Sequence, residues 1–237
     1  KSSYDDSNTL TLENIFPIGF TNVTYRYHKQ NTSFELRNIN LEINKGEKIA
    51  IIGPNGSGKS TLIDLLSGNR EDFSGSIKFD NISIEKISRK NLREKINLLS
   101  SSPFFFNTTI RKNLLLAKKN ADDSELIDVL KKVSLYNPPE IDLETMLDEL
   151  GKNLSTGELQ RLGFAQLLLR NGDLIILDEP YSNLDPEIIL NFQKIIQESF
   201  NQKAMILITH DYSKLWNIDK LIIMDNGRIK NIISGNL

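Results

Sequence analysis

The chain has 237 residues, of which 39% are hydrophobic and 25% are charged, a composition typical of a soluble globular protein with one large or two small domains. Its formal net charge of -2 argues against nucleic acid as the main partner, because nucleic-acid binding relies on basic surface. The absence of cysteine excludes disulfides and thiolate metal sites, and the presence of only two histidines argues against a zinc site.

The first residues predict a lead-in segment rather than part of a core. Residues 1–14 are polar, and we expect a loosely ordered linker there, followed by a domain over 15–237. Because the first residue is Lys1 rather than Met, we expect the chain to be a segment of a longer protein. No signal peptide opens it, and no apolar run approaches the roughly 20 residues that a membrane-spanning helix needs.

The first half of the domain predicts strands followed by short helices. Residues rich in β-formers predict strands over 18–27 and 34–43, which we expect to be antiparallel. The apolar run at 48–52 predicts a buried strand, and a helix continues over 61–66 until Gly68 ends it. Further strands are predicted at 76–79 and 96–99, and helices at 89–95, 108–116 and 122–135.

The second half of the domain alternates helices with buried strands. Helices are predicted over 155–170, 186–200 and 212–216, and strands over 173–177, 204–209 and 221–224. Strands that alternate with helices in this way predict a parallel sheet covered by helices, which is an α/β fold.

A phosphate-binding loop pattern directly follows the strand at 48–52. The pattern G-x-x-x-x-G-K-[ST] predicts backbone amides that surround an anion, a lysine that reaches the β- and γ-phosphates, and a hydroxyl that ligates Mg²⁺. A glycine-rich turn with a chance lysine is the alternative, but eight matched positions after a strand argue against it. The nucleotide-binding candidates are Gly53, Pro54, Asn55, Gly56, Ser57, Gly58, Lys59, Ser60 and Thr61.

A second candidate element is the acidic pair that ends the strand at 173–177. Strands of a parallel sheet present their carboxyl ends at one edge, where Asp178 would hold Mg²⁺, through a water, and Glu179 would polarise the attacking water. A strand that ends in two acids is common, so the prediction depends on its combination with the phosphate-binding loop.

These motifs together resemble the ATP-binding cassette (ABC) transporter family, and the resemblance covers about residues 18–233. The segment 154–161, Leu-Ser-Thr-Gly-Glu-Leu-Gln-Arg, is similar to the family signature L-S-G-G-Q-x-Q-R. The resemblance implies that the Ser155 hydroxyl and the Gly157 amide bind the γ-phosphate of ATP held by a second cassette. The segment also fits an ordinary helix capping box, and both roles can hold at once.

Three further positions match the family. Residues 182–185 resemble the loop that links two cassettes, although they also fit a turn before a helix. His210 matches the switch histidine that contacts the γ-phosphate. Tyr27 matches the aromatic residue that stacks on adenine, with Tyr25 as a competing candidate and ordinary strand packing as the alternative.

The sequence also departs from the family pattern. Ser101 stands where the family has a glutamine near Mg²⁺ and the lytic water, so this contact either runs through a bridging water or is missing. In the signature, Thr156 replaces a glycine and Glu158 replaces a glutamine, which adds bulk and negative charge where phosphate binds. We therefore hypothesise a non-identical partner cassette that supplies the better signature to this chain's own catalytic residues.

Several segments resemble exporters. Residues 145–151 align with the exporter segment T-x-V-G-E-x-G, in which Glu149 matches a glutamate that faces the transmembrane domain. The cluster at 103–106 resembles the exporter coupling surface, although three phenylalanines also suit core packing. The implied partner is an exporter transmembrane domain, which exporters often carry fused N-terminally.

The sequence therefore predicts an α/β P-loop NTPase core with a parallel sheet, an antiparallel β subdomain and a helical signature subdomain near 90–170. The predicted activity is Mg²⁺-dependent ATP hydrolysis that powers export, at the cytoplasmic face of the cell membrane. Rival functions are an ATP-binding regulatory module with little turnover and a soluble ABC ATPase that acts on DNA or ribosomes. The catalytic candidates are Glu179, His210 and Lys59, and the metal ligands are Ser60 and Asp178.

Overall fold

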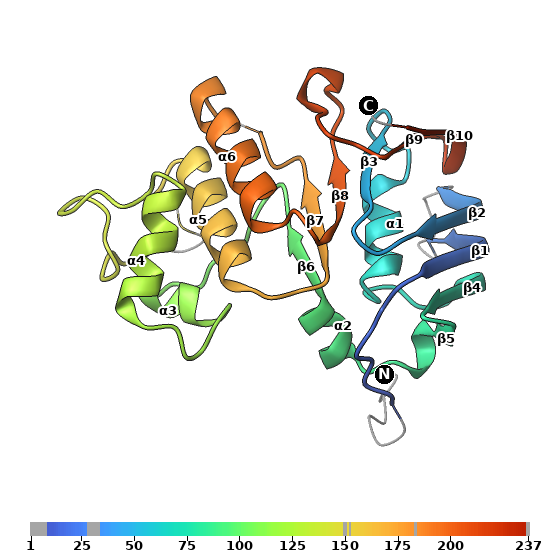
Figure 1. Cartoon of the computed structure of the whole chain (residues 1–237), viewed down its shortest axis with the longest axis horizontal. Helices are drawn as coiled ribbons and strands as arrows, with labels where there is room; N and C mark the ends of the chain where they lie inside the picture. Colours follow the sequence, from blue (N-terminus) through green and yellow to red (C-terminus); the bar gives the residue numbers. More distant parts are fainter. Residues whose placement is uncertain (1–8, 28–33, 149–150, 152, 183, 236–237) are drawn as a thin grey trace. The chain divides into compact units, whose positions relative to one another are not determined.

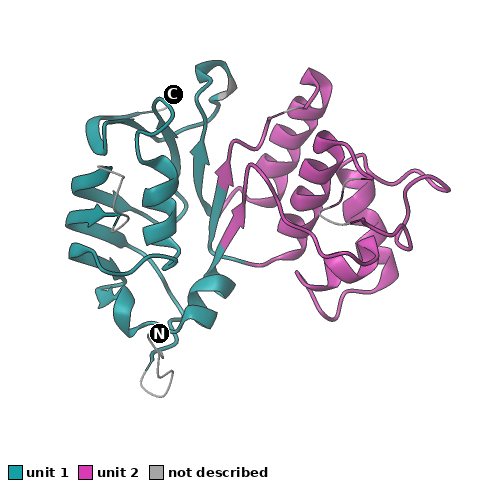
Figure 2. Cartoon of the chain, turned by 180° about the vertical axis from the view of Figure 1, so that it is seen from behind, with its two compact units in different colours: residues 1–96, 172–176, 203–237 teal, residues 97–171, 177–202 magenta. Residues whose placement is uncertain are grey.

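The structure is a computed structural model that describes residues 9–27, 34–148, 151, 153–182 and 184–235. The chain divides into two compact units, each of which is built from several stretches of sequence (Figure 2). Unit 1 comprises Lys1–Ile96, Gly172–Ile176 and Lys203–Leu237, and unit 2 comprises Asn97–Asn171 and Leu177–Gln202. The predicted domain limits at residue 14 and near residues 90 and 170 remain predictions.

Unit 1 contains a four-stranded antiparallel sheet with the order β2-β1-β4-β5. The early strands are antiparallel, as predicted, with Ile18 opposite Ile43. The alternation of buried and exposed residues along β1 is interrupted at Asn22, which has a φ of 50°. A β-bulge between Phe20 and Val23 places the Val23 side chain on the buried face again. The strands are β1 (Ile18–Arg26), β2 (Glu35–Ile43), β4 (Ser74–Phe79) and β5 (Ile82–Ser83).

The second sheet has six strands in the order β10-β9-β3-β8-β7-β6. The strand that leads into the phosphate-binding loop, β3, pairs in parallel with both β8 and β9. Its apolar residues are buried on both faces, as parallel strands require, and the predicted α/β fold class is confirmed. The strands are β3 (Lys48–Ile52), β6 (Ile96–Leu99), β7 (Leu174–Asp178), β8 (Ala204–Ile208), β9 (Lys220–Asp225) and β10 (Arg228–Ser234).

Strand β10 was not predicted, because its residues are mostly exposed and show no apolar alternation. It forms through the turn at Asn226 and Gly227, whose positive φ values of 48° and 73° suit a tight hairpin. The Asn-Gly pair is a hairpin signal that was available in the sequence. Strand β5 is too short, at two residues, for its pattern to be recognised.

The helices of unit 1 are short. Helix α1 (Lys59–Leu66) lies between β3 and the antiparallel sheet, and α2 (Arg89–Lys95) has the predicted bounds (Figure 1). The helix predicted at 212–216 is only a short 3-10 helix, η4 (Tyr212–Lys214). Another short 3-10 helix, η2 (Ile84–Lys86), precedes α2. Asp211 caps η4 by accepting a hydrogen bond of 3.0 Å from the Ser213 amide.

The part of the predicted lead-in that the structure describes, residues 9–14, makes contacts within unit 1. Leu10 and Ile87 form an isolated parallel bridge, with the Leu10 amide donating to Lys86 O at 2.7 Å. Leu12 is buried, and its amide donates to the side-chain oxygen of Asn91 at 2.9 Å. A buried asparagine thus satisfies the backbone of an otherwise polar segment, which composition does not reveal. Residues 1–8 lie outside the described residues.

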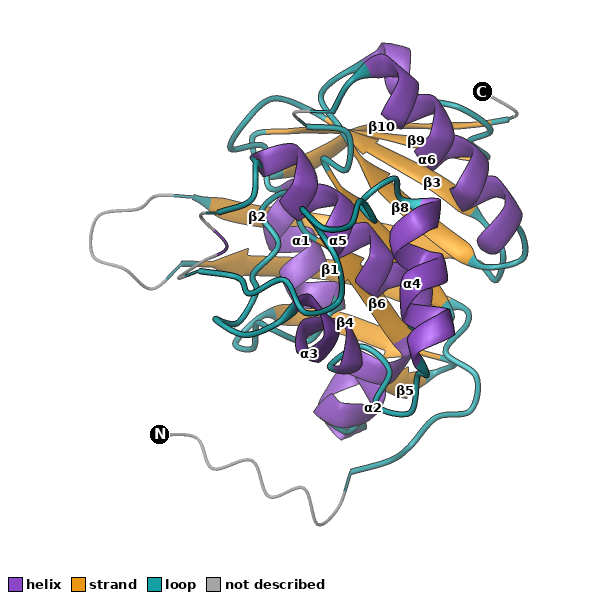
Figure 3. Cartoon of the chain, turned by 90° about the vertical axis from the view of Figure 1, so that its left-hand side faces the viewer, coloured by secondary structure: helices purple, strands orange, loops and turns teal. Residues whose placement is uncertain are grey.

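Unit 2 is largely helical, and the sequence signals mark where its helices begin (Figure 3). The side chains of Thr109, Asp122 and Ser155 each accept a hydrogen bond from the backbone amide three residues on. Pro186 occupies the first turn of α6, as predicted. The helices are α3 (Ile110–Leu115), α4 (Asp123–Lys132), α5 (Thr156–Leu169) and α6 (Pro186–Ser199).

An aromatic pair joins two of these helices at the centre of unit 2. The rings of Phe164 in α5 and Phe192 in α6 stack with centroids 4.1 Å apart, and both side chains are fully buried. A fully buried ring contributes more packing energy than other core side chains of this unit, because it removes the largest apolar area from water.

Replacing Phe192 with alanine should lower the free energy of unfolding by about 3–5 kcal/mol, because it leaves a cavity against Phe164. Urea unfolding followed by circular dichroism measures this difference. Leu190→Ala on the same helix is the matched control, since Leu190 is 67% exposed and its loss should change stability by about 0.5 kcal/mol or less. Equal effects of the two substitutions would contradict the assigned core.

Candidate functional site

The phosphate-binding loop connects β3 to α1 and is built on left-handed glycines. Gly56 has a φ of 78°, and a side chain added there would meet no atom within 4 Å, so the loop is open at this point. Gly58 has a φ of 106° and ends the loop at the N-cap of α1. A Cβ at Gly58 would lie 2.5 Å from Leu36 Cδ2, so both space and backbone angle require glycine.

Lys59 is the cation of this loop. Its side chain is 8% exposed, and its ammonium group donates to the carbonyl oxygens of Gly53 at 2.7 Å and Pro54 at 3.1 Å. The first turn of α1 holds no acidic residue, so the positive helix end and the ammonium are not neutralised locally. The Ser57 hydroxyl is buried without a hydrogen-bond partner, which leaves a polar atom for a ligand in the loop. These residues fit the triphosphate of a nucleotide.

Ser60 and Thr61 begin α1 in different environments. Ser60 is exposed, so its hydroxyl is accessible to a metal ion bound to phosphate. Thr61 is buried, and its hydroxyl lies 3.1 Å from the hydroxyl of Tyr27, with which it shares a hydrogen bond. Tyr27 is half-buried, whereas its competitor Tyr25 is only 7% exposed within β1. Of the two tyrosines, Tyr27 therefore has the more accessible ring.

His210 leaves the sheet at the same level as the loop. The register pairs Ile51 of β3 with Ile208 of β8, and Gly53 and His210 each lie two residues beyond this pair. The neighbouring Thr209 is 1% exposed, and its amide donates to Ile51 O at 3.3 Å. His210 itself is exposed. Within unit 1, parallel pairing thus brings the histidine to the strand ends from which the phosphate-binding loop begins.

The acidic pair belongs to unit 2, where β7 ends at Asp178. Glu179 has a φ of 48°, a left-handed conformation that costs a residue with a side chain about 1–3 kcal/mol. Its carbonyl accepts hydrogen bonds from the Ser182 hydroxyl at 3.0 Å and the Ser182 amide at 3.2 Å. Both acidic side chains are half-buried. Strained backbone of this kind is concentrated at functional positions, because the surrounding contacts must hold it.

The signature segment caps helix α5 as the capping-box reading predicts, and its phosphate-binding reading stays a prediction. The Glu158 amide donates to the Ser155 hydroxyl oxygen at 3.2 Å, and the Ser155 amide donates to the Glu158 carboxylate at 2.7 Å. The Ser155 hydroxyl itself donates to the same carboxylate at 2.8 Å. Ser155 is exposed and Gly157 half-buried, so this helix end is accessible. The capping carboxylate places a negative charge where the resemblance implies a phosphate.

The rest of the signature connects α5 to other parts of unit 2. Gln160 is 2% exposed, and its side-chain amide donates to Pro180 O at 3.3 Å, directly after the acidic pair. Arg161 donates to Ser134 O at 2.6 Å. Gln160 therefore ties the signature helix to the segment that follows Glu179, a role that the linear sequence did not indicate.

The aromatic segment after β6 divides into buried and exposed rings. Phe105 is 2% exposed, whereas Phe104 and Phe106 are 63% and 55% exposed and contact each other edge to face at 5.3 Å. The buried Asn113 holds this segment, because it accepts from the Phe106 amide at 2.9 Å and donates to Phe106 O at 3.1 Å. Asn113 was missed in the sequence, where an asparagine inside a short helix has no distinguishing pattern.

The remaining predicted positions are less informative. Ser101 is exposed at the position where the family has glutamine. Glu149 and Asn183, which were predicted to face the transmembrane domain and to belong to the linking loop, lie outside the described residues. Within residues 9–27, 34–148, 151, 153–182 and 184–235, no group of three or more His, Cys, Asp or Glu side chains could hold a metal ion by itself.

Comparison with known families shows to which family the chain belongs. The sequence model of the family described as ABC transporter matches residues 36–182. This range includes the phosphate-binding loop, the signature and the acidic pair. The chain belongs to the ABC transporter family. This membership confirms the family prediction.

Relatives of this ABC chain are longer proteins. It is 32% identical over 228 residues to the glutathione/L-cysteine transport system ATP-binding/permease protein CydC of Escherichia coli, covering 96% of this chain and 39% of that protein. It is 34% identical over 215 residues to the beta-(1-->2)glucan export ATP-binding/permease protein NdvA of Bartonella bacilliformis, covering 90% of this chain and 36% of that protein. The chain thus spans about two fifths of the relatives it matches.

A solved structure extends the likeness to the fold. A bacterial Atm1-family ABC exporter with ATP bound matches this ABC chain with a TM-score of 0.86 and 25% identity, over 95% of this chain and 40% of that chain. Among the parts of the chain that the structure describes, none of the helices is long and apolar enough to span a bilayer.

Replacing Lys59 with alanine should weaken ATP binding about 10- to 100-fold, because a charge-assisted contact to phosphate is lost. Isothermal titration calorimetry of ATP measures the change. Lys45→Ala is the control, since Lys45 is an exposed lysine in the turn before β3 and should leave the affinity unchanged. An unaltered affinity in the Lys59 variant would contradict the role of the loop.

Proposed function

We propose that the chain is the ATP-hydrolysing nucleotide-binding domain of an ABC exporter and that it acts with a second cassette. The observation that carries this proposal is the buried Lys59 ammonium inside a loop whose Gly56 side is open. A cation held by two carbonyl oxygens is already positioned, so an incoming phosphate would replace those contacts without moving the backbone far.

In this proposal each site residue has one task. Lys59 and the loop amides would neutralise phosphate charge, and His210 would contact the γ-phosphate. Ser60 and Asp178 would hold Mg²⁺, which when bound supplies a positive charge that stabilises the phosphate oxygens. Glu179 would orient the attacking water and accept its proton.

The left-handed backbone of Glu179 supports its assignment as the base. A residue with a side chain adopts this conformation at a cost, and two hydrogen bonds from Ser182 hold its carbonyl in place. The position of Glu179 is therefore maintained by its neighbours rather than by its own preference. A base needs such fixed placement, because small displacements from the reacting atoms reduce turnover steeply.

The partner cassette is proposed to be a different protein. Glu158 completes the capping box of α5 and places a negative charge beside Ser155, so this signature would bind a γ-phosphate less tightly than one with glutamine. The catalytic candidates Lys59, Glu179 and His210 are all present in this chain. A partner with a better signature would then complete the more active site, while this chain completes the weaker one.

A membrane domain is proposed as the second partner, and the exposed rings of unit 2 support it. Phe104 and Phe106 are large apolar side chains that remain in water in this structure. Beside them, a groove of about 180 Å³ is lined by Phe104, Pro103 and Gly163 among others. The relatives are named as ATP-binding/permease proteins, so a transmembrane domain in the same protein would place this chain at the cytoplasmic face of the membrane.

Replacing Glu179 with glutamine should lower ATP turnover about 10²- to 10⁴-fold while ATP still binds. Glutamine keeps the shape of the glutamate side chain but cannot act as the general base. Steady-state phosphate release and calorimetry on the same samples measure the two quantities. Near-normal hydrolysis by the variant would remove Glu179 from the proposed role. Binding without phosphate release in the unmodified chain, paired with its partner, would identify a regulatory module instead of an enzyme.

Replacing Glu158 with glutamine should strengthen ATP-dependent association with a partner cassette about three- to tenfold, because glutamine keeps the capping box and removes the charge. Analytical ultracentrifugation with ATP and the Glu179→Gln background, which prevents turnover, measures the association. Glu125→Gln on α4 is the control, since it removes an equal charge elsewhere in unit 2. Equal or weaker association in the Glu158 variant would refute the proposed weakness of this signature.

A further inference from the structure

The ring of Tyr27 is held by contacts on several sides. Its hydroxyl shares a hydrogen bond with Thr61, and its ring meets Tyr25 edge to face with centroids 5.3 Å apart. The ring of Phe34 lies 6.2 Å away at a tilted angle. These contacts hold the Tyr27 ring in one orientation.

Arg70 covers one face of the Tyr27 ring. Its guanidinium carbon lies 5.1 Å from the centre of the Tyr27 ring, a distance typical of a cation–π contact. Arg70 follows α1 in the chain and is fixed by Asp64 of that helix, whose carboxylate accepts a hydrogen bond of 2.9 Å. The hydrogen bond to Asp64 raises the pKa of Arg70, whose guanidinium is positively charged in proteins in any case.

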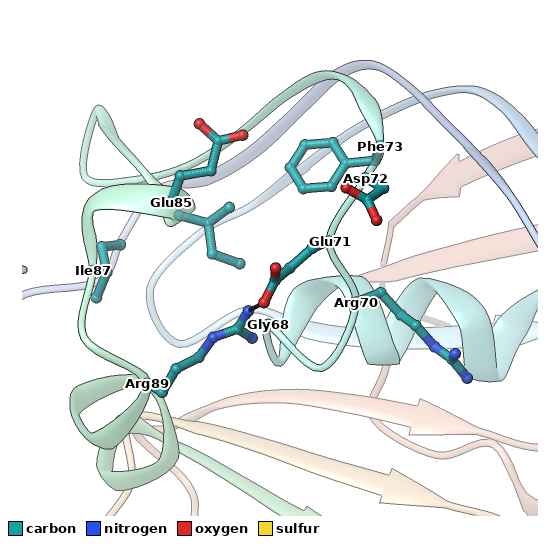
Figure 4. A pocket seen from close by; sticks show the side chains of 9 residues that line it. Gly68, Arg70, Glu71, Asp72, Phe73, Glu85, Ile87 and Arg89 are labelled. Carbon is teal, nitrogen blue, oxygen red and sulfur yellow. Dashed lines mark hydrogen bonds and ion pairs between the residues drawn. The ribbon is translucent and has the colours of Figure 1, made fainter. Parts of the chain in front are cut away.

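Arg70 also lines a cavity of about 320 Å³ between the end of α1 and the start of α2 (Figure 4). Figure 4 shows Arg89 and Glu71 facing one another across this cavity, whereas the Arg70 side chain extends away from them. The cavity itself has mixed charge, and its second arginine is already paired with Glu71. We therefore do not propose the cavity as a binding site. The informative feature is that the Arg70 side chain leaves it and reaches the Tyr27 ring.

We propose that Arg70 is a positioning residue for nucleotide recognition: it occupies one face of Tyr27 and reserves the other face for the adenine base. This inference rests on the proposed function, because it requires a nucleotide at the phosphate-binding loop, and it takes the stacking of Tyr27 on the base from the family resemblance in the sequence. Arg70 acts through Tyr27 and has no contact with the phosphates or the reacting atoms in this assignment.

The physical basis is preorganisation. A tyrosine ring that is free to rotate must lose that freedom when a base stacks on it, whereas a ring held by Arg70 and Thr61 has lost it beforehand. The guanidinium is planar and lies flat on an aromatic face, which a lysine ammonium does not reproduce. This preorganisation strengthens binding of the base and does not affect the chemical step. Loss of Arg70 should therefore lower the affinity for ATP and leave turnover at saturating ATP unchanged.

The test compares a ligand with a base and a ligand without one. Isothermal titration calorimetry measures ATP and inorganic tripolyphosphate binding to the unmodified chain and to Arg70→Ala. The variant should bind ATP about three- to tenfold more weakly, as expected for one lost cation–π contact and looser stacking, and bind tripolyphosphate equally well. In turnover assays with a partner cassette, KM for ATP should rise by the same factor and kcat should stay within about twofold.

Arg89→Ala is the matched control. It removes the same charge from the same cavity without touching Tyr27, and its ATP affinity should equal that of the unmodified chain. If Arg70→Ala does not fold, Arg70→Lys replaces it, because lysine keeps the charge beside Asp64 and loses the planar stacking group. The lysine variant should then bind ATP about two- to fivefold more weakly with unchanged tripolyphosphate affinity.

The outcomes separate the two levels of the proposal. An unmodified chain that binds neither ligand overturns the proposed function itself. Normal ATP affinity in the Arg70 variants overturns the positioning role alone. Equal losses for ATP and tripolyphosphate also overturn it, because they assign Arg70 to the phosphate-binding loop or to general stability.

Discussion

The hydrogen bonds of the Lys59 ammonium to the carbonyls of Gly53 and Pro54 are the interaction on which the rest of the site depends. They hold a buried positive charge at the point where a parallel strand changes into a helix, and a buried charge is tolerated only when it is paired or hydrogen-bonded. Two carbonyl oxygens satisfy the ammonium but do not neutralise it. The loop is therefore stable as a fold element and still strongly attractive to phosphate.

At the signature, too, the same residues stabilise the fold and form part of the proposed site. Ser155 and Glu158 satisfy the backbone of α5, so the helix begins at a defined residue and its first turn is accessible. The carboxylate that stabilises the cap opposes the anion for which the helix end is otherwise suited. In this chain the structural requirement and the proposed ligand compete at one position, which is a physical reason for two unlike ATP sites in a pair of cassettes.

Tertiary contacts also set the role of side chains that look ordinary in the sequence. Arg70 lies in a loop with no motif, yet it is aimed at Tyr27 by Asp64. Gln160 lies inside the signature, yet its amide binds the backbone after the acidic pair. In both cases a flexible polar side chain is fixed by a partner outside its own motif, six residues away for Arg70 and 20 for Gln160, and such a partner leaves no periodic pattern to detect.

The sequence by itself determined the elements whose signals are local. The apolar run of β3, the glycines of the loop and the capping residue Ser155 each act through neighbours within a few positions, so their structures follow from spacing alone. Only the tertiary structure decided that His210 is level with Gly53, because strand register is set by burial across the sheet. The docking of Leu12 on Asn91, 79 residues away, was likewise decided by packing, since long-range contacts depend on which surfaces the whole chain brings together.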